Sequence, residues 1–317
     1  MSEKIATRES YGSALNALAD KYDFLVLDAD LAAATKTGMF KKAHPDRFFD
    51  CGIAEGNMMS VAAGIATTGK VVFASTFAMF ASGRAYEQIR NSIGYPHLNV
   101  KIGATHGGIT VGEDGATHQC NEDFALMRTI PGMTVVCPAD DTEAHAAVEA
   151  AINHVGPVYM RFGRFAVPNL TPELVPDYKF EFGKGVLYRS GKDVTIIATG
   201  FMVHLAYEAA ELLGKEGIDA GVINIHTIKP LDKELILAEV KKSGAVVTAE
   251  EHTVIGGLGS AVCELLCENE PMPLVRVGVE DKYGKSGKVP ELLELYGLTA
   301  ENIVKSAKLA ISKKNSK

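Results

Sequence analysis

Short apolar stretches alternate with amphipathic stretches along the first half of the chain. Strands are expected at 24–27, 47–52, 70–74, 99–104, 133–137 and 158–162, and helices at 8–19, 55–65, 78–93, 121–129 and 142–153. Apolar strands that are separated by helices are typical of a parallel sheet with helices on both faces. The pattern therefore predicts a three-layer α/β domain over residues 1–167.

The alternation resumes after a proline-rich segment without periodicity, 168–180, which we interpret as a linker. Beyond it, strands are expected at 186–188, 194–198, 220–225, 245–249 and 274–277, and helices at 203–216, 233–242, 259–268, 289–295 and 300–311. These elements predict a second, smaller three-layer α/β domain over residues 181–317. A chain of 317 residues is long enough for two domains of ordinary size.

The composition excludes several classes of protein. With a net charge of −7 and no stripe of Lys or Arg, the chain does not resemble a nucleic-acid-binding protein. No apolar segment reaches the ~18 residues of a membrane span, and the first residues lack a signal-peptide core. We therefore expect a cytoplasmic protein that binds neither nucleic acid nor membranes. The five cysteines are widely spread and form no CxxC pair, so we expect reduced thiols and no structural zinc site.

Polar or glycine-rich turns follow four of the strands that are expected in the first domain. They lie at 28–30, 52–55, 75–77 and 105–108. In parallel α/β sheets, ligands bind beyond the carboxyl ends of the strands. The four turns therefore predict one shared crevice.

Glu55 stands at the start of an expected helix whose neighbouring positions are small or apolar. One interpretation is an acid in the first helical turn, where the helix dipole favours negative charge. The other is a partly buried carboxylate that relays a proton in catalysis. The pattern by itself leaves both open.

The segment 105–119 combines four glycines with two histidines and two acids. Glycines allow the backbone to approach a ligand closely. His106, Asp114 and His118 suit either a metal site or the binding of sugar hydroxyls and phosphate. The segment matches neither GxxxxGK[ST] nor GxGxxG, so it does not resemble a nucleotide-binding loop of a known kind.

Several further residues have two interpretations each. Phe77 and Phe80 are three positions apart, as in ordinary core packing, but beside Glu55 they can form an aromatic platform for a flat heterocycle. Arg161, at the end of an expected strand, can bind an anion. The segment 250–259 can bind an anion at a helix N-terminus or form a structural turn, and we assign it no role.

Five motifs together resemble the transketolase family: GIAEGNM, TFAMF, VGEDGATHQ, HTIKPLD and AEEHTVIGGLGS. The resemblance covers almost the whole chain and extends to 1-deoxyxylulose-5-phosphate synthase, while the β subunits of 2-oxo-acid dehydrogenases are more distant. It implies a domain that binds the pyrimidine of thiamine diphosphate, followed by a transketolase C-terminal domain. It also implies transfer of a two-carbon ketol unit between sugar phosphates.

The resemblance implies cofactor-binding roles for four residues. Glu55 hydrogen-bonds the pyrimidine N1′ of thiamine diphosphate and acts as a catalytic proton relay. Phe77 stacks on the pyrimidine, Phe80 forms part of the same wall, and Asp30 lies near the cofactor. An aromatic residue of the family's pocket aligns with Gly83, which leaves that wall thinner.

For the sugar, the resemblance implies that Asp114 and His118 bind donor hydroxyls, with His118 also taking part in catalysis. Three residues match those that hold the acceptor phosphate in the family: Arg8, His106 and Arg161. The histidine at position 106 makes the chain more similar to transketolases than to deoxyxylulose-phosphate synthases. A serine of the family's phosphate site is replaced by Ala34, which leaves the acceptor open.

The family's motif for the metal and the diphosphate, GDG followed by Asn, occurs nowhere in the chain. The resemblance therefore implies a partner, an N-terminal transketolase subunit that holds Mg²⁺ or Ca²⁺ and the diphosphate. We expect an α2β2 heterotetramer, self-association of this chain, and no metal ligands within it. Two alternatives stay open. One is a subunit of a deoxyxylulose-phosphate synthase or 2-oxo-acid decarboxylating enzyme, and the other is a non-catalytic scaffold.

Overall fold

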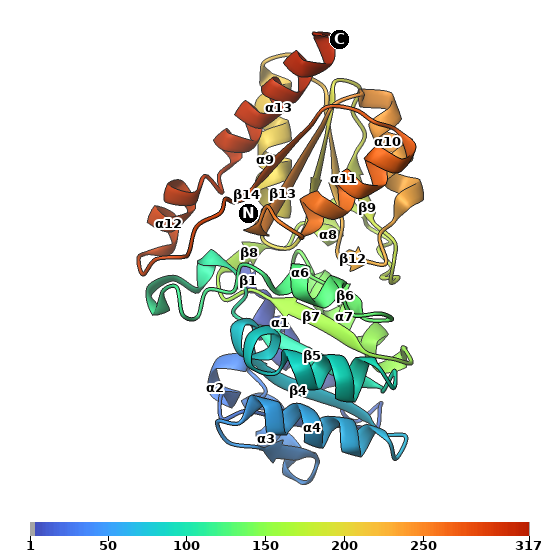
Figure 1. Ribbon diagram of the computed structural model, residues 1–317, viewed down its shortest axis with the longest axis vertical. Coiled ribbons are helices and arrows are strands. Elements are labelled where there is room, and N and C mark those ends of the chain that lie inside the picture. The colour runs from blue at the N-terminus through green and yellow to red at the C-terminus, as the bar shows by residue number, and fades with distance from the viewer. Residues whose placement is uncertain (1–3, 317) are drawn as a thin grey trace.

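The first sheet contains seven strands in the order β12-β6-β7-β5-β4-β2-β3. In the computed structural model, which describes residues 4–316, they are β2 (Phe24–Asp28), β3 (Phe48–Asp50), β4 (Val71–Phe77), β5 (Val100–Thr105), β6 (Thr134–Val136), β7 (Val158–Phe162) and β12 (Thr227–Lys229). The six strands from the first half are parallel to one another, as their separation by helices predicts. The strand β12 comes from the second half and pairs antiparallel with β6, so both halves of the chain build this sheet (Figure 1).

Helices cover both faces of the first sheet. They are α1 (Thr7–Leu18), α3 (Gly38–Ala43), α4 (Glu55–Ala66), α6 (Asp123–Arg128) and α7 (Asp141–Asn153). On one face, α1, α3 and α7 bury Tyr11, Phe40 and Val148 in one core. On the other face, α4 and α6 bury Met58 and Phe124 in a second core. The domain is therefore a three-layer α/β sandwich, as the alternation of apolar and amphipathic stretches predicts.

The helix expected at 78–93 is irregular. It forms as a wide π-helical turn η2 (Phe80–Arg84), a short α5 (Tyr86–Gln88) and a second wide turn η3 (Ile89–Gly94). A side chain at Gly83 would meet the Met79 methyl, with its Cβ only 2.6 Å from Met79 Cε. Wide turns of this kind frequently occur at functional sites.

The second domain has a five-stranded sheet in the order β14-β13-β10-β11-β9. Its strands are β9 (Val186–Arg189), β10 (Val194–Ala198), β11 (Ala220–Asn224), β13 (Val246–Thr253) and β14 (Leu274–Val279), with β9 antiparallel. Its helices are α9 (Met202–Lys215), α10 (Lys233–Ser243), α11 (Leu258–Asn269), α12 (Val289–Tyr296) and α13 (Ala300–Asn315). Helices α9 and α13 share a core on one face, and α10 and α11 share a core on the other. Figure 1 shows this domain stacked on the first, with α12 at the junction.

Two short strands that the sequence pattern does not predict join the two ends of the first domain. The strand β1 (Lys4–Ala6) pairs antiparallel with β8 (Ala166–Pro168). Beside this pair, Gly163 N donates to Thr7 Oγ1 at 2.8 Å, and Arg8 N donates to Gly163 O at 3.2 Å. These contacts place the start of α1 next to the segment that follows β7.

The segment interpreted as a linker, 168–180, packs against both domains. It contains the short helix α8 (Thr171–Leu174). Tyr178 OH donates to Glu143 Oε1 of the first domain at 2.9 Å, and Thr171 Oγ1 lies 2.8 Å from Tyr188 OH of the second domain. The segment is therefore part of the contact between the domains. Within residues 4–316, no helix is both long and apolar enough to cross a membrane.

Candidate functional site

An aromatic stack stands beyond the carboxyl ends of β4 and β5. The Phe77 ring lies on the His106 imidazole, with ring centroids 3.8 Å apart, and is stacked with Phe80 at 5.7 Å. The His118 imidazole meets both phenyl rings edge-on, at 6.2 Å from Phe77 and 5.3 Å from Phe80. Four residues that the sequence singles out are therefore brought together, from three separate segments. Flat phenyl faces of this kind suit a flat heterocycle.

The Glu55 carboxylate lies in the first turn of α4, and its side chain is only 5% exposed. Arg84 Nη1 lies 3.5 Å from Glu55 Oε1. The Arg84 guanidinium also lies over the Phe80 ring, 4.6 Å from its centroid. Arg84 thus connects the recessed carboxylate to the aromatic stack, and sequence reasoning had not singled it out. Arg84 follows Phe80 by four positions in an expected helix, and this spacing places two side chains on the same helix face.

Arg8 approaches His106 at the inner end of the site. Arg8 Nη1 lies 3.0 Å from His106 Nε2 and donates to Ala34 O at 3.1 Å. Burial and the nearby Arg8 and Arg164 charges lower the pKa of His106 to about 3, so its imidazole is neutral near pH 7. Because Arg8 donates to Nε2, the ring proton sits on Nδ1 and is shared with Thr105 Oγ1, which lies 2.9 Å away.

A second arginine, Arg164, completes this end of the site. Its Nη1 lies 3.0 Å from Asp114 Oδ2 and donates to Val111 O at 2.5 Å. Arg8 and Arg164 line one pocket of about 260 Å³. Asp114 is exposed on the 3-10 turn η4 (Ile109–Asp114), between the two predicted histidines. The sequence analysis did not single out Arg164, although it lies two residues beyond the carboxyl end of β7, where ligands bind in parallel α/β sheets.

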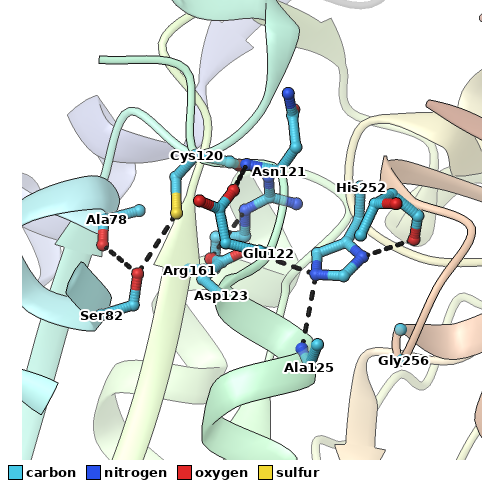
Figure 2. A network of polar contacts seen from close by, with 12 residues as sticks. Ala78, Ser82, Cys120, Asn121, Glu122, Asp123, Ala125, Arg161, His252 and Gly256 are labelled. Carbon is cyan, nitrogen blue, oxygen red and sulfur yellow. Dashed lines mark hydrogen bonds and ion pairs between the residues drawn. The ribbon is translucent and has the colours of Figure 1, made fainter. Parts of the chain in front are cut away.

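Arg161, which the sequence analysis expects in a phosphate clamp, packs against the backbone of Gly107 and is bonded within the chain. It stands inside β7 and is only 3% exposed. Its Nε lies 3.1 Å from Asp123 Oδ2, and its Nη2 donates to Cys120 O at 3.1 Å and to Glu251 O at 2.8 Å. Figure 2 shows Arg161 within this network, beside Asp123 and close to His252. Its charge is committed to the contact between the domains, so it is not available to an incoming phosphate.

Asp30 is exposed at the carboxyl end of β2 and has a left-handed backbone, with φ of 62°. Its neighbour Asp28 is buried and orders the following turn. Asp28 accepts hydrogen bonds from Leu31 N at 2.6 Å, Thr35 Oγ1 at 2.7 Å and Thr37 Oγ1 at 2.8 Å. Burial raises the pKa of Asp28 to about 6 against the opposing effect of these bonds. The turn thus held includes Ala34, whose carbonyl accepts from Arg8.

The acidic segment of the second domain, to which the sequence assigned no role, is structural. Glu250 Oε2 and Oε1 accept from Leu258 N at 2.7 Å and Gly259 N at 2.8 Å, so the anion at the start of α11 is the chain's own carboxylate. Glu251 Oε1 accepts from Thr110 N at 2.6 Å. The second domain therefore holds the loop that carries Asp114.

The residues present fit one part of the expected cofactor. Phe77, Phe80 and the recessed Glu55 provide stacking faces and a hydrogen-bonding carboxylate for an aminopyrimidine. The description of residues 4–316 contains no group of three or more His, Cys, Asp or Glu that could hold a metal ion.

Comparison with known families decides the relationship. Residues 3–169 match the family described as transketolase, pyrimidine binding domain, and residues 183–303 match transketolase, C-terminal domain. The chain belongs to the transketolase family.

Three known transketolases illustrate the similarity. A solved structure described as a split-gene transketolase in an inactive β4 tetramer is 53% identical, with a TM-score of 0.91 over 98% of this chain and 99% of that one. The 6-deoxy-6-sulfo-D-fructose transketolase subunit SqwH of Clostridium sp. (strain MSTE9) is 47% identical over 97% of this chain and 95% of that protein. The Homo sapiens transketolase is 38% identical over 98% of this chain, which spans 50% of that protein.

Proposed function

We propose that this chain is the C-terminal subunit of a split, thiamine-diphosphate-dependent transketolase. One observation carries the proposal: Arg84 connects the recessed Glu55 carboxylate to the Phe77–Phe80 stack, so a carboxylate and aromatic rings belong to one site. In this proposal the chain binds the pyrimidine half of the cofactor, and the partner subunit binds the diphosphate half. Thiamine diphosphate, when bound, supplies a thiazolium ring that accepts electrons as a carbon–carbon bond breaks.

The chain's own residues bind and orient the cofactor and the sugar. Glu55 hydrogen-bonds the pyrimidine N1′ and holds a proton there, while Phe77 and Phe80 stack on the ring. Asp30 lines the outer side of the cofactor site at the end of β2. At the sugar end, Asp114 and His118 bind hydroxyl groups, and His118 takes part in proton transfer at the reacting carbon.

An anion at the end of the sugar is bound by Arg8 and Arg164, with neutral His106 hydrogen-bonded behind Arg8. Arginine suits this position because its planar fork can meet phosphate oxygens with two parallel hydrogen bonds. Arg164 replaces Arg161 in this role. The backbone carbonyl of Ala34 accepts a hydrogen bond from Arg8 and orients it. Because a carbonyl does this, the position does not require the hydroxyl of a serine.

The partner in this proposal is an N-terminal transketolase subunit that holds Mg²⁺ or Ca²⁺ and the diphosphate, in an α2β2 assembly. Two observations support it. The chain spans 50% of the human transketolase that it matches. The similar split-gene protein is described as inactive in its β4 form, which is expected if catalysis needs the other subunit.

Reconstitution tests the proposal. The isolated chain should bind thiamine diphosphate weakly in calorimetry and show no ketol transfer. Mixing it with the N-terminal subunit of a split transketolase should produce Mg²⁺-dependent cofactor binding. The mixture should also transfer a ketol unit from a ketose phosphate to an aldose phosphate. Tight, Mg²⁺-dependent binding by this chain alone would contradict the split arrangement.

A further inference from the structure

A loop of the second domain is fastened onto the sugar end of the site. Ser286 Oγ donates to Glu113 O at 2.6 Å. On the other side of the loop, Gln119 Nε2 donates to Lys285 O at 2.8 Å. Both partners in the first domain belong to the segment that carries Asp114 and His118. The loop 284–288 is therefore positioned directly over the residues proposed to bind the sugar.

Close packing keeps this loop in register. A Cβ at Gly115 would lie 3.3 Å from Ser286 Cβ, and a Cβ at Gly112 would lie 3.3 Å from Val289 Cγ2. At Gly284, a Cβ would overlap the Gln119 amide oxygen. Glycines on both sides thus allow the two backbones to meet without a gap. The placement of the next residues, Lys288 and the start of α12, follows from these contacts.

Lys288 lines the same pocket of about 260 Å³ as Arg8 and Arg164. These three cations come from three different elements: α1, the segment after β7, and the start of α12. Arg8 Nε is buried and has no hydrogen-bond partner within residues 4–316. Lys288 is exposed and forms no ion pair among those residues. Lys288 therefore has unused hydrogen-bonding capacity at this pocket.

The acids near the pocket do not neutralise it. Among the described residues that line the pocket, Glu113 carries a carboxylate. Its hydrogen bond to the loop is made by its backbone carbonyl oxygen. Asp114 is paired with Arg164. Glu9, which also acts on Arg8, is paired with Lys36 at 2.9 Å. With that pair included, four cations face three carboxylates, which leaves one positive charge. An oxyanion with several acceptor oxygens is the ligand chemistry that fits this arrangement.

We propose that Lys288 of the C-terminal domain is a specificity-determining residue, which binds the terminal oxyanion of the sugar together with Arg8 and Arg164. This proposal rests on the proposed function, because it concerns the substrate of the same site. Phosphate and sulfonate share the required chemistry. They differ in charge, since a phosphate monoester carries nearly two negative charges near pH 7 and a sulfonate carries one.

The kinetic test uses the reconstituted enzyme with Lys288→Met, and Lys305→Met as the control. Lys305 is exposed on α13 of the same domain, and its substitution removes the same charge outside the pocket. Lys288→Met should raise KM for ribose 5-phosphate roughly tenfold, because a hydrogen bond to a charged group is lost. KM for glycolaldehyde and kcat should change little. Lys288→Arg should restore most of the affinity, and Lys305→Met should behave as wild type.

A second comparison tests which anion charge the site prefers. KM of wild type and Lys288→Met is measured for an aldose phosphate and for an aldose sulfonate of the same length. A larger KM increase for the phosphate identifies a dianion site, and an equal increase identifies a general oxyanion site. An unchanged KM for both in Lys288→Met would overturn the proposal. An equal KM increase for glycolaldehyde would overturn it as well, because Lys288 would then support the loop and not the anion.

A binding measurement separates this inference from the proposed function. Calorimetry at low ionic strength should show that the isolated wild-type chain binds ribose 5-phosphate more tightly than ribose, and that Lys288→Met removes this difference. If the reconstituted enzyme transferred no ketol unit, the proposed function would fail, yet this measurement would still decide the role of Lys288. Equal binding of ribose 5-phosphate by wild type and Lys288→Met would overturn it.

Discussion

Arg8 Nη1 lies 3.0 Å from His106 Nε2, although the two residues are 98 positions apart in the sequence. The contact requires an unprotonated Nε2, because Arg8 is the donor. Burial and the neighbouring cations Arg8 and Arg164 lower the pKa of His106 to about 3, which keeps that nitrogen free. The site therefore contains two permanent positive charges, Arg8 and Arg164, and a histidine that is neutral near pH 7.

Replacing His106 with Asn should weaken the dependence of stability on pH. Below about pH 6.5 the unfolded chain protonates this histidine, while the folded chain does so only near pH 3. The stability that depends on neutral His106 is fully present above pH ~6.5 and is lost as the pH falls toward 3. This residue contributes a slope of up to about 1.4 kcal/mol per pH unit. Urea unfolding of both proteins at about pH 7 and about pH 5.5 measures the difference, and parallel losses of unfolding free energy would contradict the assignment.

Glu55→Gln should abolish most ketol transfer in the reconstituted enzyme without unfolding the chain. A positioned acid–base group contributes roughly 10²–10⁴-fold to rate, and glutamine keeps the size of the side chain while removing its proton exchange. The melting temperature should change little. Glu87→Gln, an exposed substitution on α5 with the same change of charge, is the matched control. Near-wild-type turnover of Glu55→Gln would show that Glu55 only provides a favourable negative charge at the start of α4.

Arg164→Ala should raise KM for a phosphorylated aldose by about ten- to hundredfold, because charge-assisted hydrogen bonds to the anion are lost. KM for glycolaldehyde should change much less. The substitution also frees Asp114, whose partner is Arg164 at 3.0 Å, so KM for the donor ketose must be measured separately. Equal increases for phosphorylated and unphosphorylated acceptors would show that Arg164 orders the loop and does not bind the anion.

Arg161→Met should mainly destabilise the fold. Asp123 is fully buried, and loss of Arg161 leaves its charge without a cation at 3.1 Å. Removing one partner of a buried ion pair typically costs about 3–5 kcal/mol of unfolding free energy. The double variant Arg161→Met, Asp123→Asn should recover part of that loss, because the neutral amide still accepts from Tyr159 OH. A large KM increase for a phosphorylated acceptor only, with unchanged stability, would show instead that Arg161 binds the substrate.

The sequence by itself determined much of the architecture. The alternation of apolar and amphipathic stretches is a local signal, so it predicted the parallel strands of the first sheet and most of the helices. It did not predict β1, β8 and β12, because these short strands form only by antiparallel pairing between segments that are far apart in the sequence. It also did not predict the wide turns that replace the regular helix 78–93. The motifs singled out Glu55, and the structure buries it beside the aromatic stack.

Only the tertiary structure decided which cations line the pocket of about 260 Å³. Arg161 and Arg164 are three residues apart, and the sequence favoured the first. Their roles depend on which side chain is buried against Asp123 and the Glu251 carbonyl and which one meets Asp114. Lys288 is 124 positions after Arg164, and only the docking of its loop brings it to the same pocket. Local patterns determine the elements, whereas the protonation of a histidine and the partners of an arginine depend on burial and on distant backbone groups that only folding brings together.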